Sequence, residues 1–296
     1  MHSTPLLLTG VGGHLGQLVA ERLLDADVKS PIVATTRNPG RLDALSRRGL
    51  ILRRADFDTP DDLPAAFAGC QRMLLISTAA ANAGPPRIRQ HTHAIHAAWQ
   101  AGLRHIAYTS FLDADSTPLQ ALAADHLQTE HLLAQGRTGF TILRHAFYME
   151  MLLTTLPPAI RSGRLLSSNR HAGVAYVARA DCASADAAAL TSDFDGRRSL
   201  NITGGEAVTT AELVQLANAV LGTSIVHVEA TRHEVASHLI ACGMPPPMAH
   251  LLAAMDEGLG QGAMARVSDD FEQLTRARPI GVETFLRAHL AALLAG

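Results

Sequence analysis

The fold is decided by residues 5–16, which read Pro-Leu-Leu-Leu-Thr-Gly-Val-Gly-Gly-His-Leu-Gly. A short apolar run of strand length is followed by glycines and then by an amphipathic pattern over 15–24 that predicts a helix. Gly10 permits a tight turn, Gly13 lets the backbone approach a pyrophosphate, and Gly16 lets the helix pack closely on the sheet. The helix N-terminus presents free N–H groups and partial positive charge to phosphates. We therefore predict a dinucleotide-binding loop rather than a plain tight turn, with contacts from Thr9, Gly10, Val11, Gly12, Gly13, His14, Leu15 and Gly16.

Beyond this loop, short apolar runs alternate with stretches of helical length up to about residue 145. The runs predicted as strands cover residues 5–9, 31–35, 50–52, 73–76, 105–108 and 140–143, and a further helix is predicted over 87–101. Their continuous hydrophobicity indicates burial on both faces, as in a parallel sheet between two helical layers. The predicted class is α/β, a Rossmann-type doubly wound parallel sheet, with residues 1–150 as the nucleotide-binding domain.

The pattern changes after about residue 150. The pair Pro157-Pro158 is expected to end a helix, residues 201–205 to form a strand and a turn, and Thr209 to cap a new helix. Residues 245–247 are three prolines, which predict a rigid turn between helical pieces. We interpret residues 151–296 as a smaller, mostly helical substrate lobe without a sheet of its own, some segments of which return to the nucleotide-binding sheet.

The end of the second predicted strand indicates which dinucleotide binds. An acidic residue there would bind the ribose 2'-hydroxyl and repel a phosphate, whereas this strand ends Thr35-Thr36-Arg37-Asn38. Arg37 is suited to hold a 2'-phosphate through charge-assisted hydrogen bonds. NADPH is therefore favoured over NADH, the alternative being that Arg37 is a solvated surface residue.

Two further segments follow predicted strands, at the sheet edge where open α/β sheets bind ligands. Asp56 and Phe57 follow the third strand and are candidates to flank the adenine, although a surface turn is an equal alternative for Asp56. Ser77, Thr78 and Ala79 follow the fourth strand and are candidate cofactor contacts.

Lysine is nearly absent, since Lys29 is the single lysine among 25 basic residues. A P-loop and a Schiff-base enzyme both require a lysine at their sites, so both are excluded. Tyr108, Tyr148 and Tyr176 are the only tyrosines, and none has a lysine four residues later. The chain thus lacks the Tyr-x-x-x-Lys pair with which short-chain reductases protonate a carbonyl oxygen.

Charge and cysteine content narrow the partners and the compartment. The formal net charge is −2 and no basic run exceeds two residues, which argues against nucleic acid. We expect neither a signal peptide nor a membrane span, because the N-terminal apolar run is only of strand length. Cys70, Cys182 and Cys242 lie far apart, as reduced thiols in a reducing compartment do, so a cytoplasmic location is expected. The sequence sets no oligomeric state.

Several motifs together resemble a known family. Residues 9–16, 33–39 (VATTRNP), 105–110 (HIAYTS), 125–130 (DHLQTE) and 143–148 (LRHAFY) are similar to the NmrA-like atypical short-chain dehydrogenases. Within that family they most resemble the branch of NADPH-dependent type 2 quinone oxidoreductases, triphenylmethane reductases and flavin-free azoreductases. The similarity runs through almost the whole chain.

This resemblance implies NADPH bound on a Rossmann domain and hydride transferred directly to the substrate, without flavin or metal. It adds to the cofactor contacts already predicted the residues His145, Ala146, Phe147, Tyr148, Met149, Glu150 and Arg179. Two departures stand out. Relatives usually read Arg-Asn-Gly or Arg-Asn-Ala where this chain has Arg144-His145-Ala146, and His131 replaces the lysine that follows their Thr-Glu.

Histidines and methionines supply the remaining candidates. His126 and His145 are candidate proton donors, with a structural role on a helix face or loop as the alternative. His91, His93 and His96 lack a carboxylate or cysteine at ligand spacing, so we expect a solvated helix and no metal site. An adaptable apolar wall for a small planar aromatic substrate is the hypothesis for Phe147, Met149, Met244 and Met248, and plain lobe core is its equal competitor.

The leading hypothesis is an NADPH-dependent, flavin-free reductase that delivers hydride to quinones, azo dyes or triphenylmethane dyes. Such conjugated acceptors delocalise the charge they receive and so need no strong acid. The alternative is a non-enzymatic redox sensor of the NmrA type. A sugar-nucleotide epimerase would share the fold but requires the absent Tyr/Lys pair.

Overall fold

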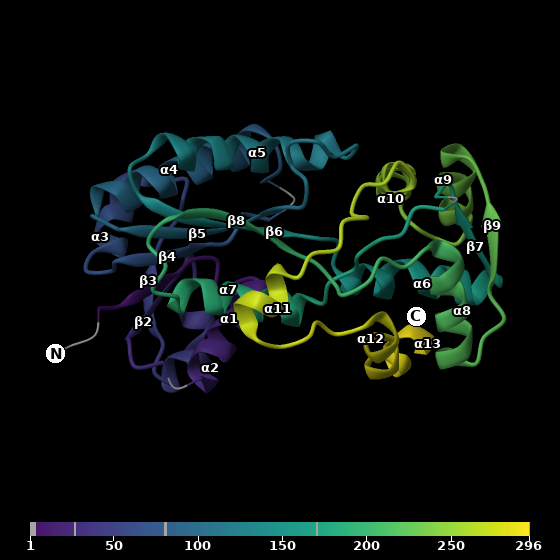
Figure 1. Ribbon diagram of the computed structural model, residues 1–296, viewed down its shortest axis with the longest axis horizontal. Helices are drawn as coiled ribbons and strands as arrows, with labels where there is room; N and C mark the ends of the chain where they lie inside the picture. Colours follow the sequence, from purple (N-terminus) through teal and green to yellow (C-terminus); the bar gives the residue numbers. More distant parts are fainter. Residues whose placement is uncertain (1–3, 27, 80–81, 170, 296) are drawn as a thin grey trace.

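A seven-stranded parallel sheet forms the larger half of the molecule. The computed structural model describes residues 4–26, 28–79, 82–169 and 171–295. All neighbouring strands are parallel, in the order β3-β2-β1-β4-β5-β6-β8 (Figure 1). The strands are β1 (Leu6–Leu8), β2 (Ile32–Thr36), β3 (Ile51–Arg54), β4 (Arg72–Leu75), β5 (His105–Phe111), β6 (Gly139–His145) and β8 (Arg197–Ile202). The predicted Rossmann-type fold class is confirmed.

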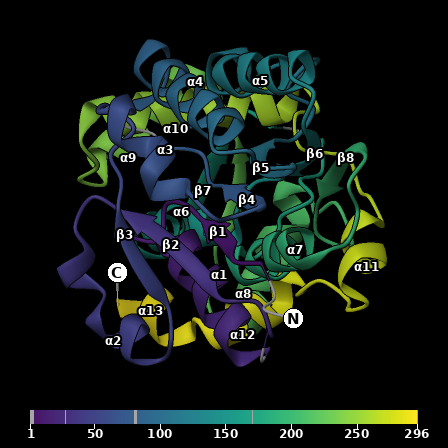
Figure 2. The same cartoon turned by 90° about the vertical axis from the view of Figure 1, so that its left-hand side faces the viewer.

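Helices cover both faces of this sheet, as Figure 2 shows. One face carries α1 (His14–Asp25), α2 (Asp43–Arg47), α7 (Arg179–Thr191) and α11 (Asp270–Thr275). The other carries α3 (Leu63–Phe67), α4 (Pro85–Gln100) and α5 (Gln120–Gln135). Short 3₁₀ turns occupy Pro39–Arg41, Pro60–Asp62 and Met149–Met151. Helix α7 packs against α1 although 153 residues lie between the end of α1 and the start of α7, so the second half of the chain completes this helical layer.

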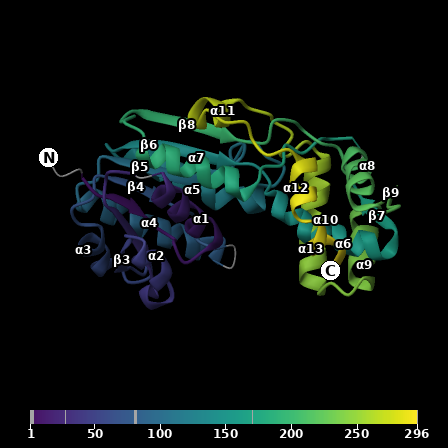
Figure 3. The same ribbon diagram turned by 90° about the horizontal axis from the view of Figure 1, so that it is seen from below.

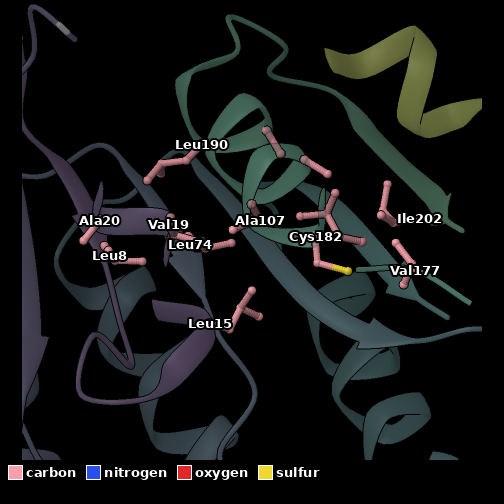
Figure 4. Close-up of a cluster of buried hydrophobic side chains, with 14 of the residues drawn as sticks. Leu8, Leu15, Val19, Ala20, Leu74, Ala107, Val177, Cys182, Leu190 and Ile202 are labelled. Atoms are coloured by element: carbon pink, nitrogen blue, oxygen red, sulfur yellow. The ribbon is translucent and has the colours of Figure 1, made fainter. Parts of the chain in front are cut away.

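The two sheet faces bury separate cores. On the α1 and α7 side, Leu8, Val19, Leu74 and Cys182 are almost wholly inaccessible and meet between the helices and the strands (Figure 4). The opposite core includes Phe67, which is fully buried. Because both faces are covered, the interior strands read as continuous apolar runs.

The smaller lobe lies beyond the carboxyl ends of the strands (Figure 3). Its helices are α6 (Leu152–Ser162), α8 (Thr210–Leu221), α9 (Arg232–Ala241), α10 (Pro246–Gly260), α12 (Val282–Ala288) and α13 (Leu290–Ala295). Thr209 and Glu212 form the expected cap of α8, each side chain bonding the other's backbone N–H. The proline triplet separates α9 from α10 as predicted, and its last two prolines begin α10.

Three expectations about these elements are wrong. The strand at residues 50–52 was expected to be buried on both faces, but β3 is the sheet edge and Ile51 is 45% exposed. Pro157 and Pro158 lie inside α6 instead of ending it, because Leu156 and Ala159 anchor that helix in the lobe core. The lobe also has a sheet of its own, in which β7 (Arg164–Ser167) pairs in parallel with β9 (Val226–Glu229).

No helix within the described residues combines the length and the apolar character needed to cross a bilayer.

Candidate functional site

The carboxyl ends of the parallel strands bring the predicted cofactor segments to one edge. Strand β1 lies between β2 and β4, so the chain order reverses beside the glycine loop, where open α/β sheets bind ligands. The Thr9 hydroxyl donates to the Leu74 carbonyl at 3.1 Å and accepts from the Ile76 backbone N–H at 3.1 Å. Thr9 thereby fixes the glycine loop against the segment that follows β4.

The glycine loop has a conformation that side chains would disturb. Gly10 has φ +69°, a left-handed conformation that favours glycine. A Cβ atom on Gly16 would lie 2.2 Å from the Gly10 carbonyl oxygen, so α1 packs directly on the loop backbone. Gly13 is the N-cap residue of α1 and supplies no side-chain cap, and the first turn contains no acidic residue. The free N–H groups of this turn are therefore available to an anion.

Arg37 extends from the end of β2 beside this loop. Its side chain is exposed and forms no hydrogen bond or ion pair with another described residue. Asp56, after β3, instead caps a turn, since its carboxylate accepts the Asp58 backbone N–H at 3.1 Å. Phe57 is half-buried and packs against the core beneath α4.

Three buried side chains hold the segment that follows β4. The backbone N–H of Ser77 donates to the Thr109 hydroxyl at 2.9 Å, and that of Thr78 donates to Nε2 of His91 at 3.1 Å. The Arg87 guanidinium donates to the Thr78 carbonyl at 3.1 Å. Ala79 is exposed at the tip, so this segment offers a fixed backbone at the sheet edge.

His91 is fully buried, which corrects the expectation of a solvated helix for this residue. Because Nε2 accepts from Thr78, the ring hydrogen sits on Nδ1 and donates to the Thr129 hydroxyl at 2.9 Å. Burial lowers the pKa of His91 to about 3, so the ring is neutral. The sequence did not reveal that His91 faces inward, because the hydroxyl it bonds lies 38 residues away in the chain.

His126 lies in the same buried network. Nε2 is 3.1 Å from the Arg87 guanidinium, which has only donors, so Nδ1 carries the hydrogen and donates to the Tyr108 hydroxyl at 3.0 Å. Burial, with the Arg87 charge, lowers the pKa of His126 to about 4. Both ring nitrogens are engaged, which favours the structural interpretation of His126 over proton donation.

The remaining acidic side chains of α5 are paired rather than free. Asp125 forms a buried ion pair with Arg87 at 3.0 Å and accepts the Gly84 backbone N–H at 2.9 Å. Glu130 holds Arg144 through two hydrogen bonds of 3.0 and 2.6 Å. The helix that would carry a Tyr/Lys acid pair thus carries side chains that stabilise the sheet edge.

His145, at the end of β6, makes a second buried contact chain. Its Nε2 is 3.0 Å from the Asp186 carboxylate on α7, and its Nδ1 is 3.1 Å from the Tyr148 hydroxyl. Asp186 is fully buried, and burial raises its pKa. Sequence reasoning missed Asp186 because it lies among alanines 41 residues from its partner.

The loop after β6 joins the two lobes. Glu150 accepts the Arg179 backbone N–H at the start of α7, at 3.1 and 3.2 Å, and the Arg179 guanidinium lies 5.2 Å from the Tyr148 ring centroid. Ala146 is buried and Phe147 half-buried against the sheet core.

The methionines proposed for a substrate wall divide into two kinds. Met149 is 1% exposed and belongs to the lobe core, the competing interpretation for that residue. Met244 is half-buried, and Met248 is 46% exposed at the start of α10. Only the latter two present side-chain surface to a ligand in this conformation. Within the described residues, no three His, Cys, Asp or Glu side chains form a metal-binding group.

Comparison with known proteins agrees with this geometry. A family model described as NAD(P)H-binding matches residues 10–193. Quinone oxidoreductase 2 of Escherichia coli (strain K12) is 32% identical over 271 residues, 92% of each chain. The NAD(P)H azoreductase of Xenophilus azovorans is 23% identical over 288 residues, which cover 97% of this chain and 98% of that protein.

Solved structures give the same picture. The E. coli NADPH-dependent quinone oxidoreductase, complexed with NADPH, has a TM-score of 0.89 at 31% identity and covers 96% of this chain and 99% of its own. The Citrobacter sp. triphenylmethane reductase has a TM-score of 0.88 at 29% identity, covering 97% of this chain and 99% of its own. The resemblance stated from the sequence motifs is confirmed.

Proposed function

This chain belongs to the NAD(P)H-binding family, and on that premise we propose that it is an NADPH-dependent reductase that passes hydride directly to conjugated electrophiles. Quinones, triphenylmethane dyes and azo dyes are the acceptor classes. The observation that carries the proposal is the uncapped first turn of α1, beside the end of β2 where Arg37 is exposed and has no partner among the described residues. Both supply positive charge to a phosphorylated dinucleotide.

The residues present fit NADPH in two respects. Gly16 has no Cβ atom, and a Cβ at this position would displace the Gly10 carbonyl. The helix N-terminus therefore comes close enough to the loop to receive a pyrophosphate. Arg37 makes no hydrogen bond or ion pair within the part of the chain that the structure describes, so it is available to a 2'-phosphate. When bound, NADPH supplies the hydride, and no flavin or metal enters the proposal.

The choice of acceptor follows from α5. His126 is held by Arg87 and Tyr108, and Glu130 by Ser110 and Arg144, so neither side chain is free to act as a strong acid. A ketone would develop an alkoxide that requires such an acid. A quinone or a cationic dye instead accommodates the transferred charge in its conjugated system, and the relatives carry names of this kind.

The substrate side is assigned to the lobe. Met244 lies in the turn between α9 and α10, and Met248 lies in the first turn of α10. Their flexible, polarizable side chains suit planar aromatic molecules of varied shape. We also propose a cytoplasmic location, supported by three cysteines that are all free thiols.

The test is an acceptor screen with purified protein and NADPH, without added flavin, followed at the nicotinamide absorbance band. We expect NADPH consumption with at least one quinone, azo dye or cationic triphenylmethane dye, stoichiometric with reduced product. If NADPH binds but no acceptor is reduced, the reductase proposal fails and a redox-sensing role is favoured instead.

A further inference from the structure

The strongest unassigned feature is the buried chain Asp186–His145–Tyr148. Asp186 projects from α7 and is wholly inaccessible, His145 ends β6 and is 4% exposed, and Tyr148 is half-buried in the following loop. The contacts are 3.0 Å from Asp186 Oδ1 to His145 Nε2 and 3.1 Å from His145 Nδ1 to the Tyr148 hydroxyl. One carboxylate, one imidazole and one hydroxyl are thus connected in series, from the buried side of α7 to the loop after β6.

The number of protons that Asp186 and His145 share follows from the burial of the pair. Oδ2 of Asp186 has no hydrogen-bond partner among the described residues, so His145 is the group that balances its charge. With a neutral His145, a charged Asp186 would leave one net negative charge in the interior, which is unfavourable. Retention of one additional proton by the Asp186–His145 pair removes that net charge.

The neighbouring groups do not supply the missing positive charge. Cys182, one turn from Asp186, is a neutral thiol because burial raises its pKa well above the usual value. On the same helix, Asp181 accepts the Ile280 backbone N–H at 2.7 Å. Arg179 lies over the Tyr148 ring, while Glu150 accepts the Arg179 backbone N–H. His126, on the α5 side, is neutral for the reasons given above.

We propose that Asp186, His145 and Tyr148 form a proton relay that supplies the proton an acceptor takes up together with the hydride. The proposal rests on the proposed function and deepens it. With His145 doubly protonated, Nε2–H is donated to Asp186 and Nδ1–H to the Tyr148 oxygen, which leaves the Tyr148 O–H free to donate outward. Tyr148 is the catalytic residue of the relay, and Asp186 is a positioning residue that acts through His145.

The step balances for a quinone. The acceptor gains two electrons and one hydrogen as hydride, and its second oxygen takes the proton from the Tyr148 O–H. The Tyr148 oxygen recovers a proton from Nδ1 of His145, whose N–H bond breaks. His145 then holds one hydrogen, on the Nε2 that faces Asp186, and solvent returns the missing proton after each turnover.

Acceptors of different charge separate this role from a structural one. A quinone needs hydride and a proton, whereas a cationic triphenylmethane dye becomes its neutral reduced form on taking up hydride alone. Loss of the relay should therefore slow the quinone reaction selectively, whereas a disturbed cofactor site would slow both acceptors together.

The variant Asp186→Asn keeps the size of the side chain but removes the charge that holds the additional proton. We expect the ratio of quinone to dye kcat to fall about 100-fold, at the lower end of the usual range for general acid catalysis. The NADPH dissociation constant, measured by fluorescence titration, should change less than threefold. Asp181→Asn is the matched control, since it neutralises another buried carboxylate of α7, and it should keep the wild-type ratio.

Tyr148→Phe provides a second variant in case Asp186→Asn does not fold, because it removes a single hydroxyl and should lower the same ratio. The ¹⁵N-histidine NMR spectrum at pH 7 is a readout that needs no cofactor. The signals of His145 are assigned as those that disappear in the variant His145→Asn. Two ring protons on His145 in the wild type, and one in Asp186→Asn, support the relay.

Parallel loss of both reactions in Asp186→Asn and Tyr148→Phe, an unchanged ratio in both, or a singly protonated His145 in the wild type would overturn the relay. If the wild type reduces neither acceptor, it is the proposed function that fails. The NMR result then still decides whether the pair retains its additional proton.

Discussion

Replacement of Gly16 by alanine tests the glycine loop by its geometry. The new Cβ atom would lie 2.2 Å from the Gly10 carbonyl oxygen and 2.8 Å from the Val11 Cα, both backbone atoms that cannot rotate away. The loop or the start of α1 must therefore retreat by at least 0.8 Å to reach 3.0 Å, the shortest separation that real Cβ atoms show. Overpacking of this kind lowers the free energy of unfolding by about 1 to 3 kcal/mol. It also moves the N–H groups assigned to the pyrophosphate.

Two other glycines serve as controls. A Cβ on Gly13 would meet its nearest neighbour at 3.5 Å, an ordinary contact, so Gly13→Ala should fold normally while losing NADPH affinity through its place in the loop. Gly40→Ala meets nothing within 4 Å and should change neither property. Urea unfolding and NADPH titration of the three variants give the result. A Gly16→Ala protein as stable as the wild type would refute the reasoning.

Three further predictions concern other sites. Arg37→Ala should raise the KM for NADPH about 10- to 100-fold, the equivalent of a charge-assisted hydrogen bond, and leave that for NADH nearly unchanged; equal effects would remove the 2'-phosphate assignment. Thr209→Ala should lower the free energy of unfolding by about 1 kcal/mol through loss of the α8 cap, and a thermal melt identical to the wild type would contradict that. His91 binds a proton near pH 6.5 when unfolded but only near pH 3 when folded, so stability should fall as pH is lowered below 6.5. The slope for such a histidine is about 1.4 kcal/mol per pH unit, and His91→Gln should make urea-unfolding curves between pH 7 and 5 depend less on pH.

The sheet could be predicted from the sequence because its interior strands are continuous apolar runs and the glycine loop marks the first crossover. Ile51 shows the limit of that signal, since an apolar residue on an edge strand looks the same as one in the interior. Pro157 shows a second limit. The burial of Leu156 in the lobe core outweighs the helix-breaking preference of the neighbouring prolines, which is the only signal that the local sequence gives.

The polar side of the site was harder to predict. Arg37 could be named as a cofactor contact because the end of the strand that follows the glycine-loop crossover has a fixed place in the fold, and that assignment stays a prediction. The partner of His145 could not be found, because Asp186 comes from a helix that returns to the sheet from the other half of the chain. Contacts of this kind depend on tertiary packing, and no local spacing of residues in the sequence predicts them.

Direct hydride transfer is the central claim, and deuterium tests it most directly. NADPH deuterated at the reactive C4 position is mixed with the purified protein and a cationic triphenylmethane dye, without added flavin. The reduced dye is then examined by mass spectrometry. We predict one deuterium on the central carbon of each product molecule. Product that carries hydrogen from solvent at that carbon, or no reduced dye at all, would contradict the account.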